Sequence, residues 1–190
     1  MDMSKHILLL LVAVAGASAA TAQTTFELIE TPGESHWADF SLSRDGRSMG
    51  CLVGGAVYWW TATGGYNYID AGTPAGSGVG MSADGSALAA ARSGPDGGVP
   101  TIWYLNGTSV NLGSLTDGCE RRHPADGAFD VSDGGNVAVG QAADCGDDVG
   151  FVWTRNEGLR GLGEPIEGAS RGSAVSADGR TVVGFCEHPE

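Results

Sequence analysis

Short segments that alternate apolar with polar or small residues recur along most of the chain, as half-buried β-strands do. Each follows a segment rich in aromatic and β-branched residues, a composition that strands favour. The three pairs are 58–61 with 66–69, 102–104 with 110–112, and 151–154 with 159–162. No helical periodicity accompanies them. We therefore expect residues 24–186 to be almost entirely strand and turn.

A serine followed by a turn sequence and another apolar stretch occurs four times. The serines are Ser43, Ser82, Ser132 and Ser176, which lie 39, 50 and 44 residues apart. Three of the turns contain Asp-Gly pairs: Asp45 and Gly46, Asp84 and Gly85, and Asp178 and Gly179. Asp-Gly suits a tight hairpin because glycine adopts positive φ without strain. We expect four strands per unit, A to D, with these pairs in the A-to-B turns.

The repeat predicts an all-β fold of four-stranded antiparallel units, propeller-like, forming either a partial ring or four blades. A four-stranded meander cannot bury both of its faces alone, so the units must pack on one another. A β-sandwich with an accidental repeat is the alternative fold. Residues 23–190 are long enough for one compact domain, and we expect a single one.

The two ends of the chain bear on whether such a ring closes. Residues 26–33 resemble residues 66–74 and therefore have the pattern of an isolated strand D. The fourth copy stops just after strand B, at Cys186 and a polar tail. The isolated strand D could complete this fourth unit, but an aromatic strand C would still be missing. We expect the chain to be the front part of a longer array.

Three tryptophans, Trp60, Trp103 and Trp153, share one position of the repeat in strand C. A large aromatic side chain there would fill the space between neighbouring units, so we expect all three to be buried. Tyr58, Trp59 and Trp60 are also consecutive, and adjacent residues of a strand face opposite ways. A surface that stacks on sugars or peptides is the alternative role for this cluster.

Residues 1–22 have the pattern of a cleaved secretory signal, in which Lys5 precedes an apolar run over 7–15 and small residues end at Ala22. A membrane-spanning helix needs roughly 20 apolar residues, and this run is shorter. We expect a mature chain that starts at Gln23 and is secreted, periplasmic or at the cell surface, without membrane insertion. A retained leader that anchors the protein is the alternative.

The chain is strongly acidic, with a formal net charge of −13 at pH 7, and Lys5 is the sole lysine. The lack of a basic patch excludes electrostatic binding of nucleic acid or of an anionic membrane. A protein or carbohydrate partner is the class that remains. Acidic segments at 117–126 and 144–148 are weak candidates for calcium binding, with solvated loops as the alternative. We expect no metal and no cofactor.

The four cysteines are Cys51, Cys119, Cys145 and Cys186, and no CxxC pair or cysteine–histidine group indicates zinc or redox chemistry. In an up-and-down unit, the D-to-A loop and the B-to-C loop emerge on the same face. Cys119 and Cys145 lie in these two loops of the third unit, so we predict a disulfide between them, which export permits. Cys51 and Cys186 could meet only in a closed four-bladed ring, and four reduced thiols are the alternative.

One pattern runs through the last part of the repeat region, at Phe151, Trp153, Thr154, Gly158, Leu162, Gly163, Val175, Ser176, Asp178, Gly179, Val182, Val183 and Gly184. In this pattern the chain resembles the HAF-type extracellular repeat over residues 39–186. The second copy departs from it at 100–107 and is more similar to TolB-type propeller repeats. Both resemblances imply a propeller-like fold, and the resemblance to the HAF-type repeat implies no general catalytic role. Within this repeat pattern, we interpret Ser176 and Asp178 as residues that cap a turn rather than as a catalytic pair.

Candidate catalytic residues are few in the predicted mature chain. Its histidines are His36, His123 and His188, all in segments expected to be loops or tail, and no nucleophile, base and orienting group come together in the sequence. We expect an exported scaffold for binding or cell-surface interaction without catalytic activity. A propeller-fold hydrolase or lyase whose site lies in missing blades is one alternative, and a purely structural surface repeat is the other.

Overall fold

A computed structural model of the chain describes residues 8–13, 25–32, 38–72, 78–115, 126–144, 147–162 and 169–187. Three four-stranded antiparallel sheets, here called units 1, 2 and 3, are followed by a two-stranded unit 4. Unit 1 contains β3 (Ala38–Leu42), β4 (Ser48–Val53), β5 (Ala56–Thr61) and β6 (Gly65–Ala71). Unit 2 contains β7 (Gly80–Met81), β8 (Ala87–Gly94), β9 (Gly97–Tyr104) and β10 (Ser109–Asn111).

Unit 3 contains β11 (Gly127–Val131), β12 (Val137–Asp144), β13 (Asp147–Thr154) and β14 (Gly158–Gly161), and unit 4 contains β15 (Ser170–Val175) and β16 (Val182–Cys186). A separate hairpin pairs β1 (Leu8–Ala13) with β2 (Thr25–Glu30). Among the described residues the helical structure is one short 3₁₀ turn, η1 (Asp133–Gly135). The structure thus confirms the expected all-β fold of four-stranded antiparallel units.

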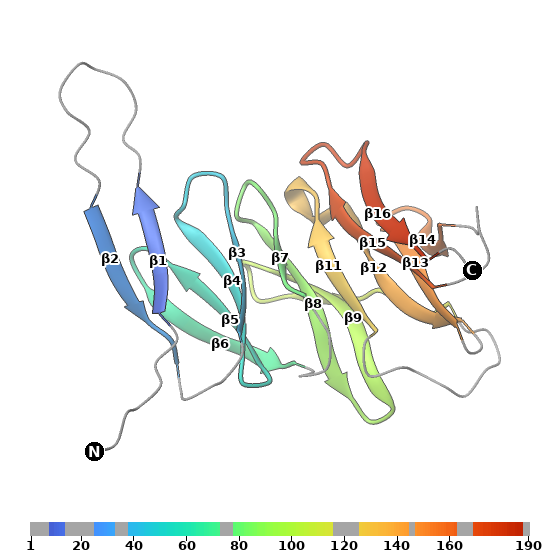
Figure 1. Cartoon of the computed structure of the whole chain (residues 1–190), viewed down its shortest axis with the longest axis horizontal. Helices are drawn as coiled ribbons and strands as arrows, with labels where there is room; N and C mark the ends of the chain where they lie inside the picture. The colour runs from blue at the N-terminus through green and yellow to red at the C-terminus, as the bar shows by residue number, and fades with distance from the viewer. Residues whose placement is uncertain are drawn as a thin grey trace.

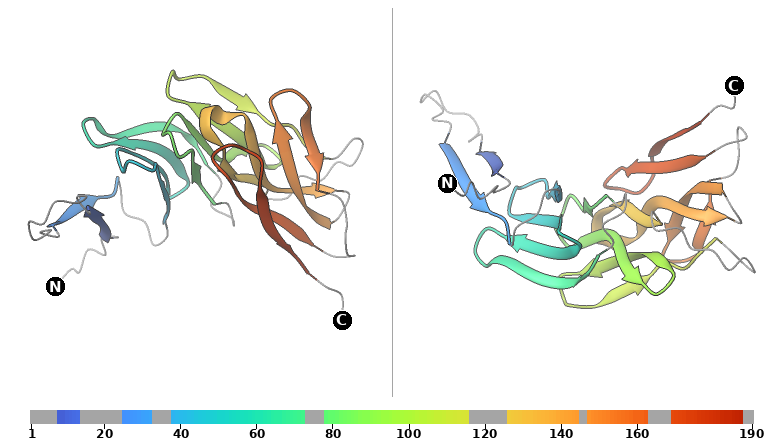
Figure 2. Two further views of the ribbon diagram at one scale, coloured as in Figure 1. Left: turned by 90° about the horizontal axis from the view of Figure 1, so that it is seen from above. Right: turned by 60° about the horizontal axis from the view of Figure 1, so that its bottom comes forward.

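The units follow one another along an arc, with the β1–β2 hairpin at one end and unit 4 at the other (Figure 1). The first strands of successive units contact one another in the order β3, β7, β11 and β15. Figure 2 shows the sheets stacked beside one another along this arc. Backbone amides join neighbouring units through side-chain oxygens, as in Met81 N to Ser41 Oγ at 2.9 Å and Val175 N to Asp130 Oδ2 at 2.8 Å.

The Asp-Gly pairs lie in the turns between β3 and β4, β7 and β8, and β15 and β16. In each turn the serine hydroxyl donates to the aspartate two residues later, at 2.7 to 2.8 Å, and accepts a backbone N–H five residues later. The glycines have φ of 70° at Gly46, 69° at Gly85 and 71° at Gly179. Local hydrogen bonds and a glycine therefore shape all three turns in the same way.

Unit 3 makes its turn differently. Its Ser132 hydroxyl still accepts the Val137 N–H at 3.0 Å, but glycine stands two residues after the serine where the other turns have aspartate. The segment forms η1 instead, with positive φ at Gly134 and Gly135. The serine contact thus persists when the Asp-Gly pair is absent.

The three strand-C tryptophans occupy equivalent places in the sheets. Trp60 lies opposite Met49, Trp103 opposite Leu88, and Trp153 opposite Ala138. Their exposed fractions are 9%, 3% and 6%. Trp103 packs in an apolar cluster with residues of unit 1, and Trp153 in one with residues of unit 2. Each of these two side chains therefore fills the space toward the preceding unit.

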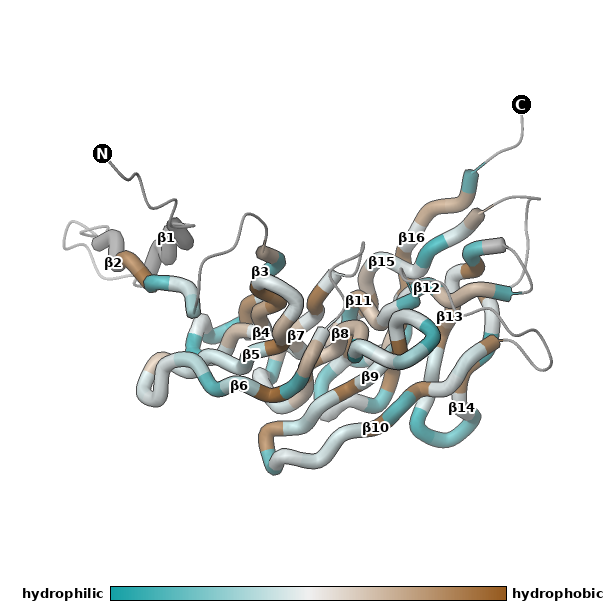
Figure 3. Tube along the Cα trace, turned by 90° about the horizontal axis from the view of Figure 1, so that it is seen from below, coloured by the Kyte–Doolittle hydropathy of each residue, from teal (hydrophilic) through white to brown (hydrophobic). Residues whose placement is uncertain are grey.

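The apolar core is divided among the interfaces between units rather than gathered in one centre. One cluster joins units 1 and 2, a second joins units 2 and 3, and a third lies on the outer face of unit 1 with Trp60. Figure 3 shows hydrophobic positions interrupted by hydrophilic ones along the strands. The inner strands β8 and β9, with a neighbouring unit on each face, are nevertheless buried over most of their length.

The N-terminal strand does not complete unit 4. β2 covers most of the segment with a strand-D pattern, but it pairs with β1, from Leu8 opposite Glu30 to Ala13 opposite Thr25. The hairpin and unit 4 also lie at opposite ends of the arc (Figure 1). Most of the predicted leader lies outside the described residues, and no helix among those described is long and apolar enough to cross a membrane.

Two of the four cysteines, Cys51 and Cys186, lie within the described residues. Cys51 in β4 and Cys186 in β16 are both free, so the pairing that a closed four-bladed ring would allow is absent. Burial raises the pKa of the Cys51 thiol to about 12, which keeps this thiol protonated at neutral pH. Cys119 and Cys145 lie outside the described residues, as do His36, His123 and His188.

Candidate functional site

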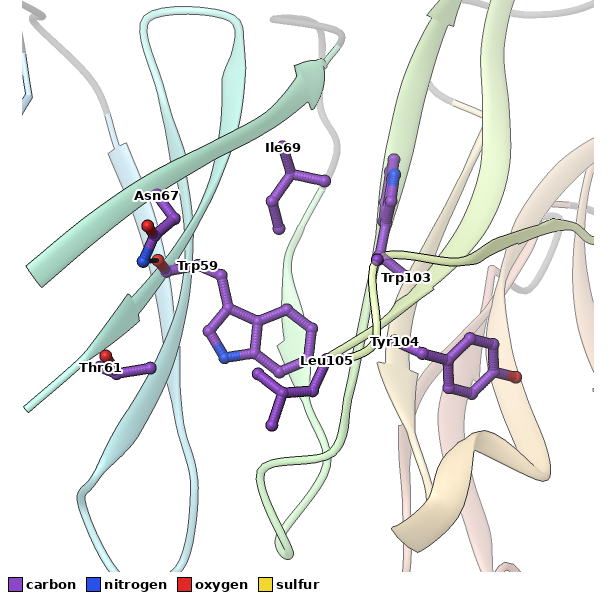
Figure 4. A pocket seen from close by; sticks show the side chains of 8 residues that line it. Trp59, Thr61, Asn67, Ile69, Trp103, Tyr104 and Leu105 are labelled. Carbon is purple, nitrogen blue, oxygen red and sulfur yellow. Dashed lines mark hydrogen bonds between the residues drawn. The ribbon is translucent and has the colours of Figure 1, made fainter. Parts of the chain in front are cut away.

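A cavity of about 270 Å³ lies between units 1 and 2, where the outer strands of the two sheets face each other. Figure 4 shows side chains from β5 and β6 on one side, and from the end of β9 and the turn after it on the other. The lining residues are Trp59, Thr61, Asn67, Ile69, Trp103, Tyr104, Leu105 and Gly107. Most of this wall is apolar or aromatic.

The alternation of strand side chains explains which residues of unit 1 reach this cavity. Trp60 faces away from unit 2. Its sequence neighbours Trp59 and Thr61 lie on the opposite face of the strand and therefore face unit 2. Asn67 lies opposite Trp59 on β6 and therefore joins the same face. Thr61 directly follows the strand-C tryptophan, the position that Tyr104 holds in unit 2. A small residue there leaves space at the interface.

The indole N–H of Trp59 has no hydrogen-bond partner among the described residues, although its nitrogen is buried and the residue is only 4% exposed. The nearby Asn67 amide nitrogen donates to the Trp59 carbonyl at 3.5 Å and, as a donor, cannot accept the indole N–H. An unpaired buried donor typically costs about 1–3 kcal/mol. A residue that lines the cavity therefore carries an unsatisfied donor.

The opposite wall is held in place by charged neighbours. The Trp103 indole N–H points to Asp70 Oδ2 at 3.4 Å, and Arg92 Nε donates to the same oxygen at 2.7 Å. The Arg92 guanidinium also lies 5.5 Å from the centre of the Trp103 ring. These contacts link β6 of unit 1 to unit 2 and fix the Trp103 ring beside the cavity.

Tyr104 directs its ring away from the cavity, toward unit 3, whereas Leu105 lies beside Trp59 (Figure 4). The Tyr104 hydroxyl donates to the Gly135 carbonyl at 3.0 Å and accepts from Arg155 at 2.8 Å. Burial raises the pKa of Tyr104, although the Arg155 charge opposes this shift. Leu105 is 64% exposed and directly follows Tyr104. Leu105 therefore adds an exposed apolar side chain to the rim of the cavity.

The chemistry of the lining favours binding over proton transfer. Tyr104 is its one ionisable side chain, and its hydroxyl is already occupied by the two hydrogen bonds. Within the described parts of the chain, no three His, Cys, Asp or Glu residues are grouped so as to hold a metal. The cavity can accept an apolar group, and one of its lining residues, Trp59, carries an unpaired donor.

The predicted site residues fall in two kinds of place. The Asp-Gly pairs lie in turns away from the cavity, and Trp60 and Trp153 lie in other parts of the core. Trp103 is the one residue of the predicted set that lines the cavity. Trp59 lines it as well, whereas Tyr58 lies on the opposite face, with ring contacts to Tyr66 and Tyr68.

Sequence reasoning missed Thr61, Asn67, Ile69 and Leu105 as cavity residues. One signal was available, because a residue next to the buried strand-C tryptophan must face the following unit. A threonine at that position, where the second copy has tyrosine, marks a place where packing is incomplete.

The fold is similar to that of TolB-type β-propellers. TolB from Acinetobacter baumannii has a TM-score of 0.59 at 13% sequence identity, over 87% of this chain and 43% of that one. A protein provisionally named TolB from Agrobacterium tumefaciens also has a TM-score of 0.59, at 16% identity over 85% and 57% of the two chains. The chain thus spans about half the length of these structures.

A third structure, provisionally named a 6-phosphogluconolactonase from Bacteroides uniformis, has a TM-score of 0.44 at 18% identity, over 84% of this chain and 48% of that one. In sequence, the chain matches no model of a protein family, so the resemblance to HAF-type repeats gains no support there. No curated protein matches it either. The likeness to TolB therefore establishes a propeller-like fold and nothing about activity.

Proposed function

We propose that this chain is an exported propeller-type scaffold that binds a polypeptide partner without transforming it. In this proposal the cavity between units 1 and 2 accepts an apolar or aromatic side chain of the partner. The observation that carries the proposal is a largely apolar and aromatic cavity lined by Trp59, whose buried indole N–H has no partner among the described residues. A backbone carbonyl next to the bound side chain would accept this hydrogen bond.

A side chain fits the cavity better than a larger ligand does. A volume of about 270 Å³ suits one aromatic or branched apolar group, and Trp59, Trp103 and Leu105 supply apolar contact on both sides. Burying such a group contributes roughly 1.5–3 kcal/mol. The polar groups near the cavity are too few to match the many hydroxyls of a sugar, so a peptide is favoured over a carbohydrate.

Export belongs to the same proposal and is supported by the pattern of residues 1–22. A secreted, periplasmic or cell-surface location would place the cavity where extracytoplasmic partners are available. The net charge of −13 favours partners that carry basic residues near the bound side chain.

The experiment follows the Trp59 indole N–H resonance by NMR in the chain from residue 23 to 190, with Trp59→Phe used to assign it. The probes are capped tripeptides Ala-Xaa-Ala with Phe, Leu or Lys in the centre, and maltotriose as a carbohydrate. We expect saturable shifts with Phe and Leu, weak in affinity, and none with Lys. Shifts with maltotriose alone, or with no probe, would contradict the proposal, and the second result would favour a purely structural repeat.

A matched pair of variants assigns the effect to the cavity. Thr61→Tyr places in unit 1 the residue that unit 2 has at the same position, so we expect it to fill the cavity and abolish the shifts. Thr61 and Thr154 each accept a backbone N–H in their turn, at 3.0 and 3.1 Å. Thr154→Tyr therefore loses the same kind of hydrogen bond at another interface, and it should leave binding unchanged.

A further inference from the structure

The turn between β9 and β10 borders the cavity between units 1 and 2. Leu105 and Gly107 line this cavity, and Asn106 stands between them in the sequence. All three residues are exposed. A chemical change at Asn106 would therefore alter the rim of the cavity without touching its buried wall.

Asn106 is the one asparagine of the chain that is followed by glycine. In an Asn-Gly sequence, no side chain on the second residue hinders its backbone nitrogen from approaching the side-chain carbonyl carbon of the asparagine. Because the two groups belong to adjacent residues, an intramolecular attack is favoured over attack by solvent water. A Cβ atom at Gly107 would meet no atom within 4 Å, so the space around this backbone is open.

Hydrogen bonds within the turn activate the side-chain carbonyl of Asn106. Its Oδ1 accepts the Thr108 backbone N–H at 3.0 Å and the Thr108 hydroxyl at 2.7 Å. Two donors on one carbonyl oxygen stabilise the negative charge that develops there when a nucleophile attacks the carbon. The turn therefore holds the asparagine side chain in a form that is open to attack.

We propose that Asn106 is a site of spontaneous modification, at which the Gly107 backbone nitrogen converts the asparagine to aspartate and isoaspartate. The nitrogen bonds to Asn106 Cγ, the bond from Cγ to the side-chain nitrogen breaks, and ammonia leaves with the proton of the Gly107 N–H. Water then opens the resulting succinimide ring at either of its two carbonyl carbons. The net reaction consumes one water and releases one ammonia, and nothing is oxidised or reduced.

One hydrogen bond opposes the reaction. The Gly107 N–H donates to the Tyr104 carbonyl at 2.9 Å, and this bond must be released before the nitrogen can attack. The bond lies in an exposed turn, where local opening costs little compared with global unfolding. The reaction therefore proceeds in the folded chain, at a rate that opening of this turn controls.

Asn111 provides a natural comparison in the same hairpin. It is exposed, and its Oδ1 likewise accepts a backbone N–H two residues later, from Gly113 at 2.9 Å. The residue after it is Leu112, which is 4% exposed and packs in the apolar cluster between units 2 and 3. The Leu112 N–H also donates to the Pro100 carbonyl of β9 at 2.9 Å. Asn111 should therefore be stable under conditions that convert Asn106.

The first test incubates the chain from residue 23 to 190 in mildly alkaline buffer made with water labelled with heavy oxygen. Peptide mapping by mass spectrometry locates the label, and circular dichroism verifies that the chain stays folded. We expect the label to enter at Asn106 at least roughly tenfold faster than at Asn111, and Asn106→Gln to abolish this uptake. Equal rates at the two asparagines, or uptake at neither, would overturn the proposal.

The second test concerns the hydroxyl of Thr108. Thr108→Val keeps the backbone N–H that reaches Asn106 Oδ1 but removes the hydroxyl donor, so it should slow the conversion at least about threefold. Thr108→Ser retains a hydroxyl and is the matched control, which should keep the rate of the unchanged chain. Conversion that is as fast or faster in Thr108→Val would overturn the role assigned to this hydroxyl.

The effect on binding rests on the proposed function. Isoaspartate adds one carbon to the main chain between Leu105 and Gly107, and both products place a carboxylate there. Anion-exchange chromatography separates the converted chain, whose Kd for Ala-Phe-Ala should be at least about threefold higher because part of the Leu105 contact is lost. Equal affinity of the two forms would overturn this effect. A failure of the unconverted chain to bind would contradict the proposed function alone, because the conversion is measured by mass.

Discussion

The interface between units 1 and 2 contains a cavity, whereas the equivalent interface between units 2 and 3 is closed by a tyrosine and an arginine. Thr61 and Tyr104 occupy the same repeat position, directly after the strand-C tryptophan. Tyr104 reaches the Gly135 carbonyl at 3.0 Å, and Arg155 lies over its ring at 5.3 Å. The shorter Thr61 instead accepts the N–H of Gly64 in its own turn.

A second pair of equivalent residues reinforces this difference. Asn67 lies opposite Trp59 in unit 1, and Val110 lies opposite Ile102 in unit 2. Val110 packs against the apolar cluster between units 2 and 3, while Asn67 lines the cavity. At these two positions the same backbone repeat thus carries different side chains at a packed interface and at an interface that contains a cavity.

The largest expected effect comes from removing the strand-C tryptophans. Trp153→Ala should lower the free energy of unfolding by about 3–5 kcal/mol, because it leaves a void in a closed apolar cluster. Trp103→Ala should cost less within that range, because its void joins a cavity that is already open. Urea unfolding of both variants measures the two losses.

Trp153→Phe is the control for this comparison, since it keeps an aromatic ring and should lose less than Trp153→Ala. A larger loss for Trp103→Ala than for Trp153→Ala would show that the two interfaces do not differ in packing as described.

Tyr104→Thr places the unit 1 residue in unit 2 and should open the closed interface. We expect a loss of about 2 kcal/mol in unfolding free energy, since the ring is partly buried and both of its hydroxyl contacts disappear. Tyr104→Phe removes only the hydroxyl and should cost about 1 kcal/mol. Equal losses in the two variants, measured by urea unfolding, would mean that the ring does not fill the interface.

The smallest expected effect is a loss of folding stability at low pH that arises from Asp84 in the A-to-B turn of unit 2. Burial alone would raise the pKa of Asp84, but hydrogen bonds from Ser82, Ser86 and the Gly134 N–H of unit 3 lower it below 3.8. A lowered pKa in the folded state means stability that is present above the unfolded value of about 3.9 and lost as the pH falls through the folded value. Acid should therefore weaken the link between units 2 and 3.

Asp84→Asn should reduce the loss of stability between pH 6 and pH 3, by less than about 1 kcal/mol because the group is largely exposed. Asp45→Asn is the matched variant, since Asp45 has bonds within its own turn and none to unit 2 among the described contacts. Thermal melts across this pH range compare them. Equal acid sensitivity of the two variants would argue against a contribution from the bond to Gly134.

Much of the fold could be read from local patterns. The turns at Ser43, Ser82 and Ser176 depend on hydrogen bonds between residues two and five positions apart. All the residues that make each turn are therefore close together in the sequence. The strand-C position of Trp103 follows from alignment of the repeat. The pairing of β2 could not be found this way, because a strand-D pattern does not specify which strand lies beside it.

The all-β repeat, its turns and the strand-C position of its tryptophans follow from residue type, alternation and short-range hydrogen bonds, all of which are local in the sequence. That Thr61 of unit 1 and Leu105 of unit 2 line one cavity, and that β16 pairs only with β15 among the described strands, becomes visible only in the folded chain. A cavity depends on which side chains meet across two sheets. That meeting depends on how successive units pack, which no single segment encodes.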